Sequence, residues 1–269
     1  MEDISDRREG LSQHRSVSQL KTYERCPYSY KLGRLDKVWE RPAAWLAQGS
    51  AVHEAAEAYE RSNRTMTLEA MQDVFRVSYE THINAACETT PNFQVWFASG
   101  PYAGETDVER RYHIGLEQCE KYLRWYTNHP DEVIWIAEDG TPGIEIGFDI
   151  DLDGVPVRGF IDAVIKQGDV VVVRDNKTGA QPGDAFQLAV YAVALAEQYN
   201  IAQPGVGDYW MGKSGKPTVP YDLSEWTRDR VAGKFKELEE NINEGRFDPL
   251  PESSKCRFCS VSYACEYSV

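Results

Sequence analysis

Cysteines at the two ends of the chain most constrain how it can fold. Cys26 lies near the N-terminus, and Cys256, Cys259 and Cys265 lie close to the C-terminus of the 269-residue chain. Four thiolates can ligate a [4Fe–4S] cluster or a zinc ion, and spacing alone does not decide between them. A shared centre would tie residue 26 to the C-terminal segment and close a very long loop.

The composition predicts a cytoplasmic protein. No apolar run approaches the ~20 residues of a membrane helix, and residues 1–10 lack the apolar core of a signal peptide. In the cytoplasm, clustered cysteines bind metal more often than they form disulfides. We expect Cys87 and Cys119, which lie between the two ends, to be small buried residues.

The net charge of −14 argues against a broadly basic surface for binding nucleic acid. The charge is uneven, because residues 12–41 hold seven Lys or Arg against three acids. This local excess of +4 suits either a channel for a phosphate backbone or a solvated helix face. Both interpretations remain open at this point.

Hydrophobic periodicity divides the chain into helical and extended parts. We expect residues 1–15 to be a polar lead-in and residues 16–269 to form a single domain. Within it we predict a helical insertion over about 62–140, a core over about 141–215, and a C-terminal helix with the cysteines over about 222–269. Helical patterns cover residues 16–32, 44–61, 67–86, 107–128, 184–198 and 224–243.

The sequence pattern predicts a β-sheet in the middle of the chain. Residues 144–152 alternate apolar with polar or small side chains, and Asp153-Gly154 is a strong hairpin turn. A return strand over 155–165 and a valine run over 170–173 follow, with a short strand over 206–211. The predicted fold class is therefore α/β (α+β), with a central mixed β-sheet flanked by helices.

Two carboxylates and a lysine meet at this sheet. Asp175 and Lys177 follow the valine run and project to the same side of an extended chain. Asp162 ends the neighbouring strand, which brings its carboxylate beside that of Asp175. Two adjacent carboxylates repel each other unless a cation separates them, so we predict a hard divalent metal, Mg²⁺ or Mn²⁺. Lys177 would orient the attacking water or neutralise developing charge.

This arrangement resembles the PD-(D/E)XK nuclease superfamily, with Asp162 as the first acidic residue and residues 175–177 as the D-x-K element. The resemblance implies a restriction-endonuclease-like core. Residues 49–53 (GSAVH) are similar to the RecB-type branch, in which a histidine supplies a metal ligand, here His53. Gly49 shares the helix face of His53, and we expect its missing side chain to leave room for what His53 contacts. The carbonyl of Asn176 is a further candidate metal ligand.

Two more elements carry the resemblance. Gln187 and Tyr191 match the Q-x-x-x-Y element of RecB-type nucleases, which implies a support for the active site and the DNA strand; Tyr191 equally suits a core position. The cysteine pattern is similar to the iron–sulfur subgroup, which includes CRISPR-associated four-cysteine nucleases and the AddB nuclease domain. It implies a [4Fe–4S] cluster on Cys26, Cys256, Cys259 and Cys265 that joins the two terminal segments, with zinc as the alternative occupant.

The function that the resemblance implies is a metal-dependent DNA nuclease, an exonuclease acting on single strands or duplex ends. Its partner is DNA, with a protein partner in a recombination, repair or CRISPR complex. The alternative is a non-catalytic docking module built on the same fold. Glu145 suits either an additional acidic residue near the metals or a solvent-exposed position. Its strand has polar residues at every other position, so we expect it to be exposed to solvent.

Overall fold

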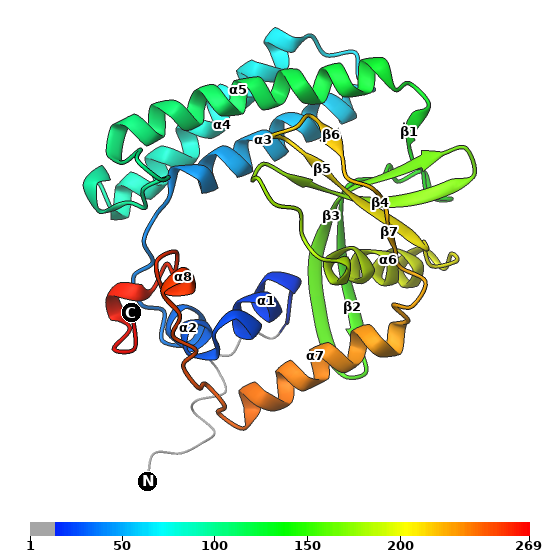
Figure 1. Cartoon of the computed structure of the whole chain (residues 1–269). Helices are drawn as coiled ribbons and strands as arrows, with labels where there is room; N and C mark the ends of the chain where they lie inside the picture. Colours follow the sequence, from blue (N-terminus) through cyan, green and yellow to red (C-terminus); the bar gives the residue numbers. More distant parts are fainter. Residues whose placement is uncertain (1–13) are drawn as a thin grey trace. The chain divides into compact units, whose positions relative to one another are not determined.

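A computed structural model describes residues 14–269 (Figure 1). The predicted lead-in lies outside these residues except for residues 14 and 15. The chain divides into two compact units. The terminal unit comprises residues 14–41, 149–159 and 227–269, and the sheet unit comprises residues 42–148 and 160–226. None of the helices within 14–269 is long and apolar enough to cross a membrane.

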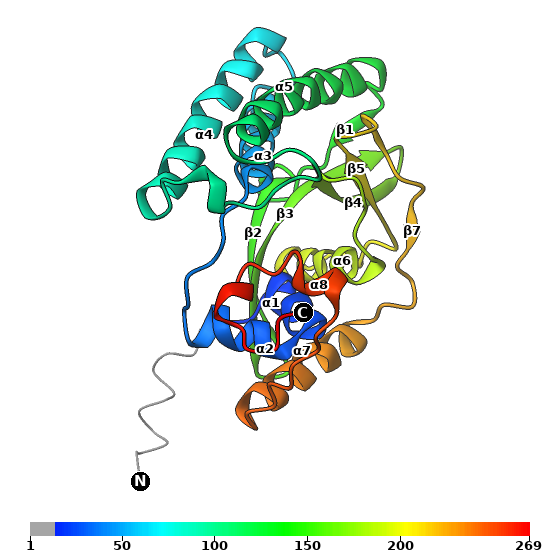
Figure 2. The ribbon, with the colours of Figure 1, turned by 60° about the vertical axis from the view of Figure 1, so that its left-hand side comes forward.

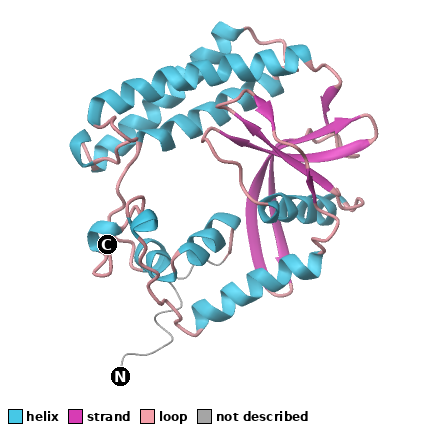
Figure 3. Ribbon diagram, in the orientation of Figure 1, coloured by secondary structure: helices cyan, strands magenta, loops and turns pink. Residues whose placement is uncertain are grey.

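The sheet is mixed (Figure 3). Its strand order is β1-β3-β4-β5-β6, with β2 paired to β3 and β7 paired to β5. β3 and β4 are antiparallel, whereas β4 and β5 are parallel. The strands are β1 (Glu132–Ile134), β2 (Ile144–Leu152), β3 (Val155–Gln167), β4 (Val170–Lys177), β5 (Val206–Met211), β6 (Lys216–Pro217) and β7 (Tyr221–Asp222). This mixed sheet with flanking helices confirms the predicted fold class.

One face of the sheet is covered by a layer of three helices, α3 (Ala44–Arg61), α4 (Leu68–Thr89) and α5 (Gly104–Asn128). Their shared core includes Trp210 of β5, whose ring packs edge-on against Tyr122 at 4.9 Å. Arg174 of β4 points to the same side, where Tyr126 of α5 and the carboxylates of Glu132 and Asp208 surround it. The predicted helical insertion thus forms one layer together with α3.

The other face of the sheet is covered by α6 (Ala185–Tyr199). This helix is apolar almost all round, and its residues Leu188–Leu195 are buried. Such a helix has to pack on several sides at once. Asp184 caps it, because its side chain accepts a hydrogen bond from the Gln187 N–H. The cap fixes where α6 begins, beside the ends of β4 and β5, and so places the first turn of α6 next to the candidate active site described below.

The terminal unit brings residues 14–41 together with residues 227–269 (Figure 2). Its helices are α1 (Val17–Arg25), α2 (Pro27–Tyr30), α7 (Arg228–Asn243) and α8 (Ser253–Cys256), with shorter turns at Lys31–Leu35 and Ser262–Ala264. Arg25 donates a hydrogen bond to the Lys255 carbonyl at 2.7 Å, and the Arg41 N–H donates to the Ser260 carbonyl. The two terminal segments are therefore hydrogen-bonded to each other within this unit, and the cluster expected to join them stays a prediction.

The predicted helix over 16–32 is not continuous, so that prediction was wrong. α1 ends at Arg25, and Cys26 has an extended backbone with φ −166° and ψ 106°. Pro27 explains the break, because a proline ring disfavours the helical conformation in the residue before it. α2 then restarts with Pro27 in its first turn, where a missing N–H costs nothing. The break leaves Cys26 in a corner between two helices.

Candidate active site

β4 carries a buried carboxylate next to a partly exposed amine. Asp175 and Lys177 lie two residues apart on one face of the strand, and the Lys177 Nζ is 2.7 Å from the Asp175 Oδ2. The Asp175 side chain is only 3% exposed, whereas that of Lys177 is 30% exposed. A buried carboxylate is costly unless a cation pairs with it, and Lys177 is such a cation.

α6 holds the other oxygen of this carboxylate. The Gln187 Nε2 donates to the Asp175 Oδ1 at 2.5 Å, and the Tyr191 OH donates to the same oxygen at 3.1 Å. The Gln187 Oε1 accepts from the Lys177 Nζ at 3.2 Å. Burial and then the Asp175 charge raise the pKa of Tyr191, so its hydroxyl remains a donor. The Q-x-x-x-Y residues are therefore both bound to the carboxylate of the D-x-K element.

β3 brings a second aspartate to the same place. Ala163 pairs with Arg174 in the antiparallel ladder, so Asp162 lies at the next position, beside Asp175. The Asp162 Oδ2 accepts a hydrogen bond from the Asn176 N–H at 2.7 Å. The Asn176 side chain is buried. The backbone carbonyl of Asn176 remains a predicted metal ligand. The two carboxylates are thus positioned by backbone pairing.

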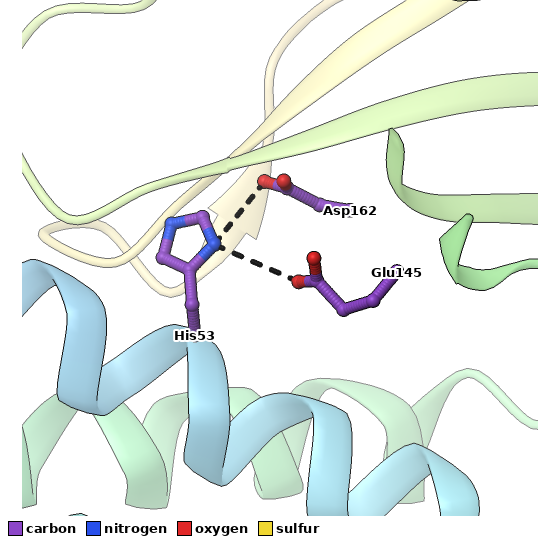
Figure 4. A group of neighbouring side chains, drawn as sticks. All are labelled: His53, Glu145 and Asp162. Carbon is purple, nitrogen blue, oxygen red and sulfur yellow. Dashed lines mark ion pairs between the residues drawn. The ribbon is translucent and has the colours of Figure 1, made fainter. Parts of the chain in front are cut away.

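α3 brings His53 to this pair of strands (Figure 4). The His53 Nδ1 lies 3.4 Å from the Asp162 Oδ2 and 3.9 Å from the Glu145 Oε1. Gly49 has a different role from the predicted one, because a Cβ there would lie 3.3 Å from the Thr178 Oγ1. The glycine thus lets α3 approach Thr178, the residue that follows β4.

Glu145 belongs to the same cluster, so the prediction that it is exposed to solvent was wrong. Its side chain is 22% exposed and lies beside His53. The alternating pattern identifies a polar face but not which side chains from other elements lie beside it, here His53 of α3. The hairpin contains a signal for the observed position of Glu145. A two-residue turn at Asp153-Gly154 sets the strand register so that Glu145 lies opposite Asp162.

The electrostatics of this group favour a bound cation. Burial raises the pKa of Asp162 to about 7, and the charges of Asp175 and Glu145 act in the same direction. Burial alone would lower the pKa of His53, but Asp162, Glu145 and Asp175 outweigh it and raise that pKa to about 9. Several carboxylates crowd a small, partly buried volume in which like charges repel each other.

The donor atoms also fit a divalent metal. One ligand atom each from His53, Glu145 and Asp162 lies within 4.8 Å of the others. Carboxylate oxygens with an imidazole nitrogen suit Mn²⁺ and, with more oxygen donors, Mg²⁺. Asp175 and the Asn176 carbonyl would add oxygens from the adjacent strand. The residues present therefore fit the group that the sequence predicts.

The four terminal cysteines line one pocket in the terminal unit. Cys26, Cys256, Cys259 and Cys265 are all half-buried, and none is in a disulfide. The Cys26 Sγ accepts a hydrogen bond from the Leu250 N–H at 3.4 Å, and burial raises the pKa of Cys259. Of the two other cysteines, Cys119 is buried as predicted in the α3–α5 layer, and Cys87 is half-buried.

Comparison with known proteins identifies the family. A sequence profile of the PD-(D/E)XK nuclease superfamily matches residues 14–266. The chain belongs to the PD-(D/E)XK nuclease superfamily. Nucleases of this superfamily use divalent metals, in agreement with the group formed by His53, Glu145 and Asp162.

Two phage proteins are close in sequence to this member of the superfamily. The chain is 52% identical over 258 residues to the Gene 69 protein of Mycobacterium phage D29, covering 93% of this chain and 96% of that protein. It is 50% identical over 277 residues to the Gene 69 protein of Mycobacterium phage L5, covering 93% and 95%. Among solved structures, it is similar to a "putative exonuclease" from Eubacterium rectale, with 12% identity, a TM-score of 0.48, and coverage of 98% of this chain and 93% of that one.

Proposed function

We propose that this protein is a metal-dependent DNA exonuclease that hydrolyses phosphodiester bonds at single-stranded or duplex ends. The observation that carries the proposal is the convergence of His53, Glu145 and Asp162 on the Asp175–Lys177 ion pair. A lysine paired with a buried aspartate beside three side chains that could ligate a metal supports a catalytic role over an inactive scaffold. The family supplies the reaction class, and the intact set of side chains supports activity.

The metal ligands in this proposal are His53, Asp162, Asp175 and the carbonyl of Asn176, with Glu145 added on the strength of its position. A bound Mg²⁺ or Mn²⁺ would lower the pKa of water at the site and neutralise charge on the phosphodiester. The β3–β4 pairing and the Asn176 N–H hold Asp162 in place for this task.

We assign Lys177 a role separate from metal binding. Its Nζ lies between the Asp175 Oδ2 and the Gln187 Oε1, and 30% of its side chain remains exposed. From there the ammonium can orient the attacking water or balance charge that develops in the transition state. Gln187 and Tyr191 position Asp175 through its Oδ1, and we assign them to orientation of the active site and the DNA strand.

We further propose that the four terminal cysteines hold a [4Fe–4S] cluster, which would place the protein in the RecB-type iron–sulfur subgroup. Their common pocket and partial burial support a shared centre. Such a centre would link residue 26 to residues 256–265 and stabilise the terminal unit. Iron and acid-labile sulfide analysis of anaerobically purified protein separates this cluster from zinc, because only the cluster contains sulfide.

The activity is tested with three substrates of one sequence: linear single-stranded DNA, the same DNA closed into a circle, and linear RNA. With Mg²⁺ or Mn²⁺ we expect digestion of the linear DNA from its ends, an intact circle, and no reaction in EDTA. Cleavage of the circle would replace the exonuclease assignment with an endonuclease, and cleavage of RNA alone would replace the substrate. Failure to cut any of the three would contradict the proposal.

A further inference from the structure

An exposed phenylalanine lies on the same face of β3 as the candidate metal ligand Asp162. Phe160 is 65% exposed, and its side chain precedes that of Asp162 by two strand positions. Residues two apart on a strand point to the same side and lie ~6.6 Å apart along it. The aromatic ring is therefore within one nucleotide of a phosphate held at the carboxylates.

The neighbouring strand leaves space for this ring. Gly147 of β2 lies beside it, and a Cβ at Gly147 would be 3.2 Å from the Phe160 Cε1. The ring thus lies over a backbone that carries no side chain. The Gln198 Nε2 of α6 donates to the Gly147 carbonyl at 3.1 Å, which ties this part of β2 to the sheet unit. Phe160 therefore lies against β2 while most of its surface remains open.

Exposed apolar residues are common, so exposure alone means little. The position of Phe160 is what matters. The next functional group along its face is Asp162, and the strand that carries Gly147 also carries Glu145, so the ring borders the metal-ligating group. These carboxylates repel a phosphate backbone in the absence of metal, so a contact to the base would supply affinity that charge does not.

We propose that Phe160 is the stacking platform for an unpaired nucleobase next to the phosphodiester that is cut. This inference rests on the proposed nuclease function and names the substrate class of the same site. Stacking on an aromatic ring tolerates every base, because each base has a π-face, and it requires a base that is free of its duplex neighbours. Phe160 would therefore favour single strands and frayed ends without sequence preference.

The test measures binding, so it does not depend on cleavage. Fluorescent single-stranded oligonucleotides, each with one abasic residue at a stepped distance from the end, are titrated with the full-length protein. Ca²⁺, another hard oxygen-seeking cation, replaces Mg²⁺ during the titration. At one position the abasic residue should weaken binding to the wild-type protein by about 5- to 150-fold, the range for loss of one base–aromatic stack. The same abasic residue should have no effect on the Phe160→Ala variant, because the two changes remove the same contact.

Three further variants sharpen the result. Phe160→Trp should retain wild-type binding, whereas Phe160→Leu, which keeps an apolar side chain but loses the π-face, should bind like Phe160→Ala. Val77→Ala on α4 is the matched control, because Val77 is 67% exposed and lies outside this face. Thermal unfolding of the Phe160 variants should match that of the wild type, since the replaced side chain is mostly in solvent.

Equal affinity of wild type and Phe160→Ala for every oligonucleotide would overturn the inference. So would equal losses for both proteins at every abasic position, or wild-type affinity in Phe160→Leu. Cleavage in Mg²⁺ is scored separately on the intact oligonucleotide. A protein that cuts DNA without any effect of Phe160→Ala refutes the stacking role alone, and one that shows the abasic effect but never cuts refutes the nuclease proposal alone.

Discussion

Asp162 accepts a 2.7 Å hydrogen bond from the backbone N–H of Asn176, the residue between Asp175 and Lys177. The bond ties the first acidic residue of the motif to the middle of the D-x-K element. Because it starts from the backbone, the identity of residue 176 has little effect on it. The two carboxylates therefore keep their spacing as long as β3 and β4 stay paired.

Lys177→Met should abolish cleavage while leaving the fold intact, with a lower melting temperature because the buried Asp175 loses its paired cation. The change removes a charge next to the reacting phosphate, and loss of one such electrostatic contact lowers kcat by ~100-fold or more. Single-turnover cleavage and circular dichroism measure the two effects. Lys166→Met, which removes an exposed lysine of β3 from a different part of the same sheet, is the matched control. Wild-type kcat in Lys177→Met would exclude this lysine from the mechanism.

Tyr191→Phe should slow cleavage by about 10- to 150-fold, the range expected when a hydrogen bond to a buried charge is lost. The Tyr191 OH and the Gln187 Nε2 donate to the same oxygen of Asp175, so Gln187→Leu should have a similar effect. The double variant should lose less than the product of the two single effects, because both act through one carboxylate. Strict multiplication of the two losses would show that the residues act independently.

Metal affinity should rise steeply with pH. Cations bind the deprotonated forms of His53 and Asp162, whose pKa values are raised to about 9 and about 7 in the metal-free protein. Binding at pH 6 must displace a proton from each group, and between pH 7 and 9 it must displace one from His53. The Mn²⁺ dissociation constant should fall by up to ~10-fold per pH unit between 7 and 9, and more steeply below 7.

Mn²⁺ titrations from pH 6 to 9 measure this dependence, and His53→Asn provides the control. The variant has no imidazole to deprotonate, so its affinity should change less steeply with pH between 7 and 9, where the remaining dependence comes from Asp162 without the His53 charge that lowers its pKa. A flat profile in the wild-type protein would show that His53 does not bind the metal.

Cys259→Ser should remove the visible absorbance of the proposed cluster and lower the melting temperature of the terminal unit. The reason is that Cys259 shares one pocket with the three other terminal cysteines. Cys87→Ser, at a half-buried cysteine of the helical layer, should keep both properties. Amide hydrogen exchange of residues 14–41 and 227–269 measures the expected loss of stability in the terminal unit directly. A brown Cys259→Ser protein with unchanged protection would remove this residue from the ligand set.

Much of the sheet unit could be predicted because its signals are local. The alternation in β2, the Asp153-Gly154 turn and the valine run of β4 each determine a conformation within a few residues. Because Asp175 and Lys177 lie two residues apart on one strand, their side chains are predicted to project to the same side. Gln187 and Tyr191 lie one helical turn apart, which explains why both reach the same carboxylate.

Other features depend on contacts that no local pattern contains. The prediction that Glu145 is exposed to solvent failed because alternation does not reveal that His53 of α3 lies beside it. The role of Gly49 at Thr178 depends in the same way on how α3 meets β4. By contrast, the break at Cys26 had a local cause in Pro27, and the hydrophobic pattern across it concealed the signal.

The proposed metal-dependent nuclease activity is tested most sharply by comparing wild-type protein with Asp175→Asn. Calorimetry measures Mn²⁺ binding, and the same preparations are assayed for cleavage of end-labelled DNA. Asp175 bears the contacts from Lys177, Gln187 and Tyr191, and asparagine preserves its shape while removing its charge. We expect metal-dependent cleavage by the wild type, with weaker Mn²⁺ binding and no cleavage in the variant. Undiminished cleavage by Asp175→Asn, or a wild-type protein that binds Mn²⁺ and cuts no DNA, would contradict the proposed activity.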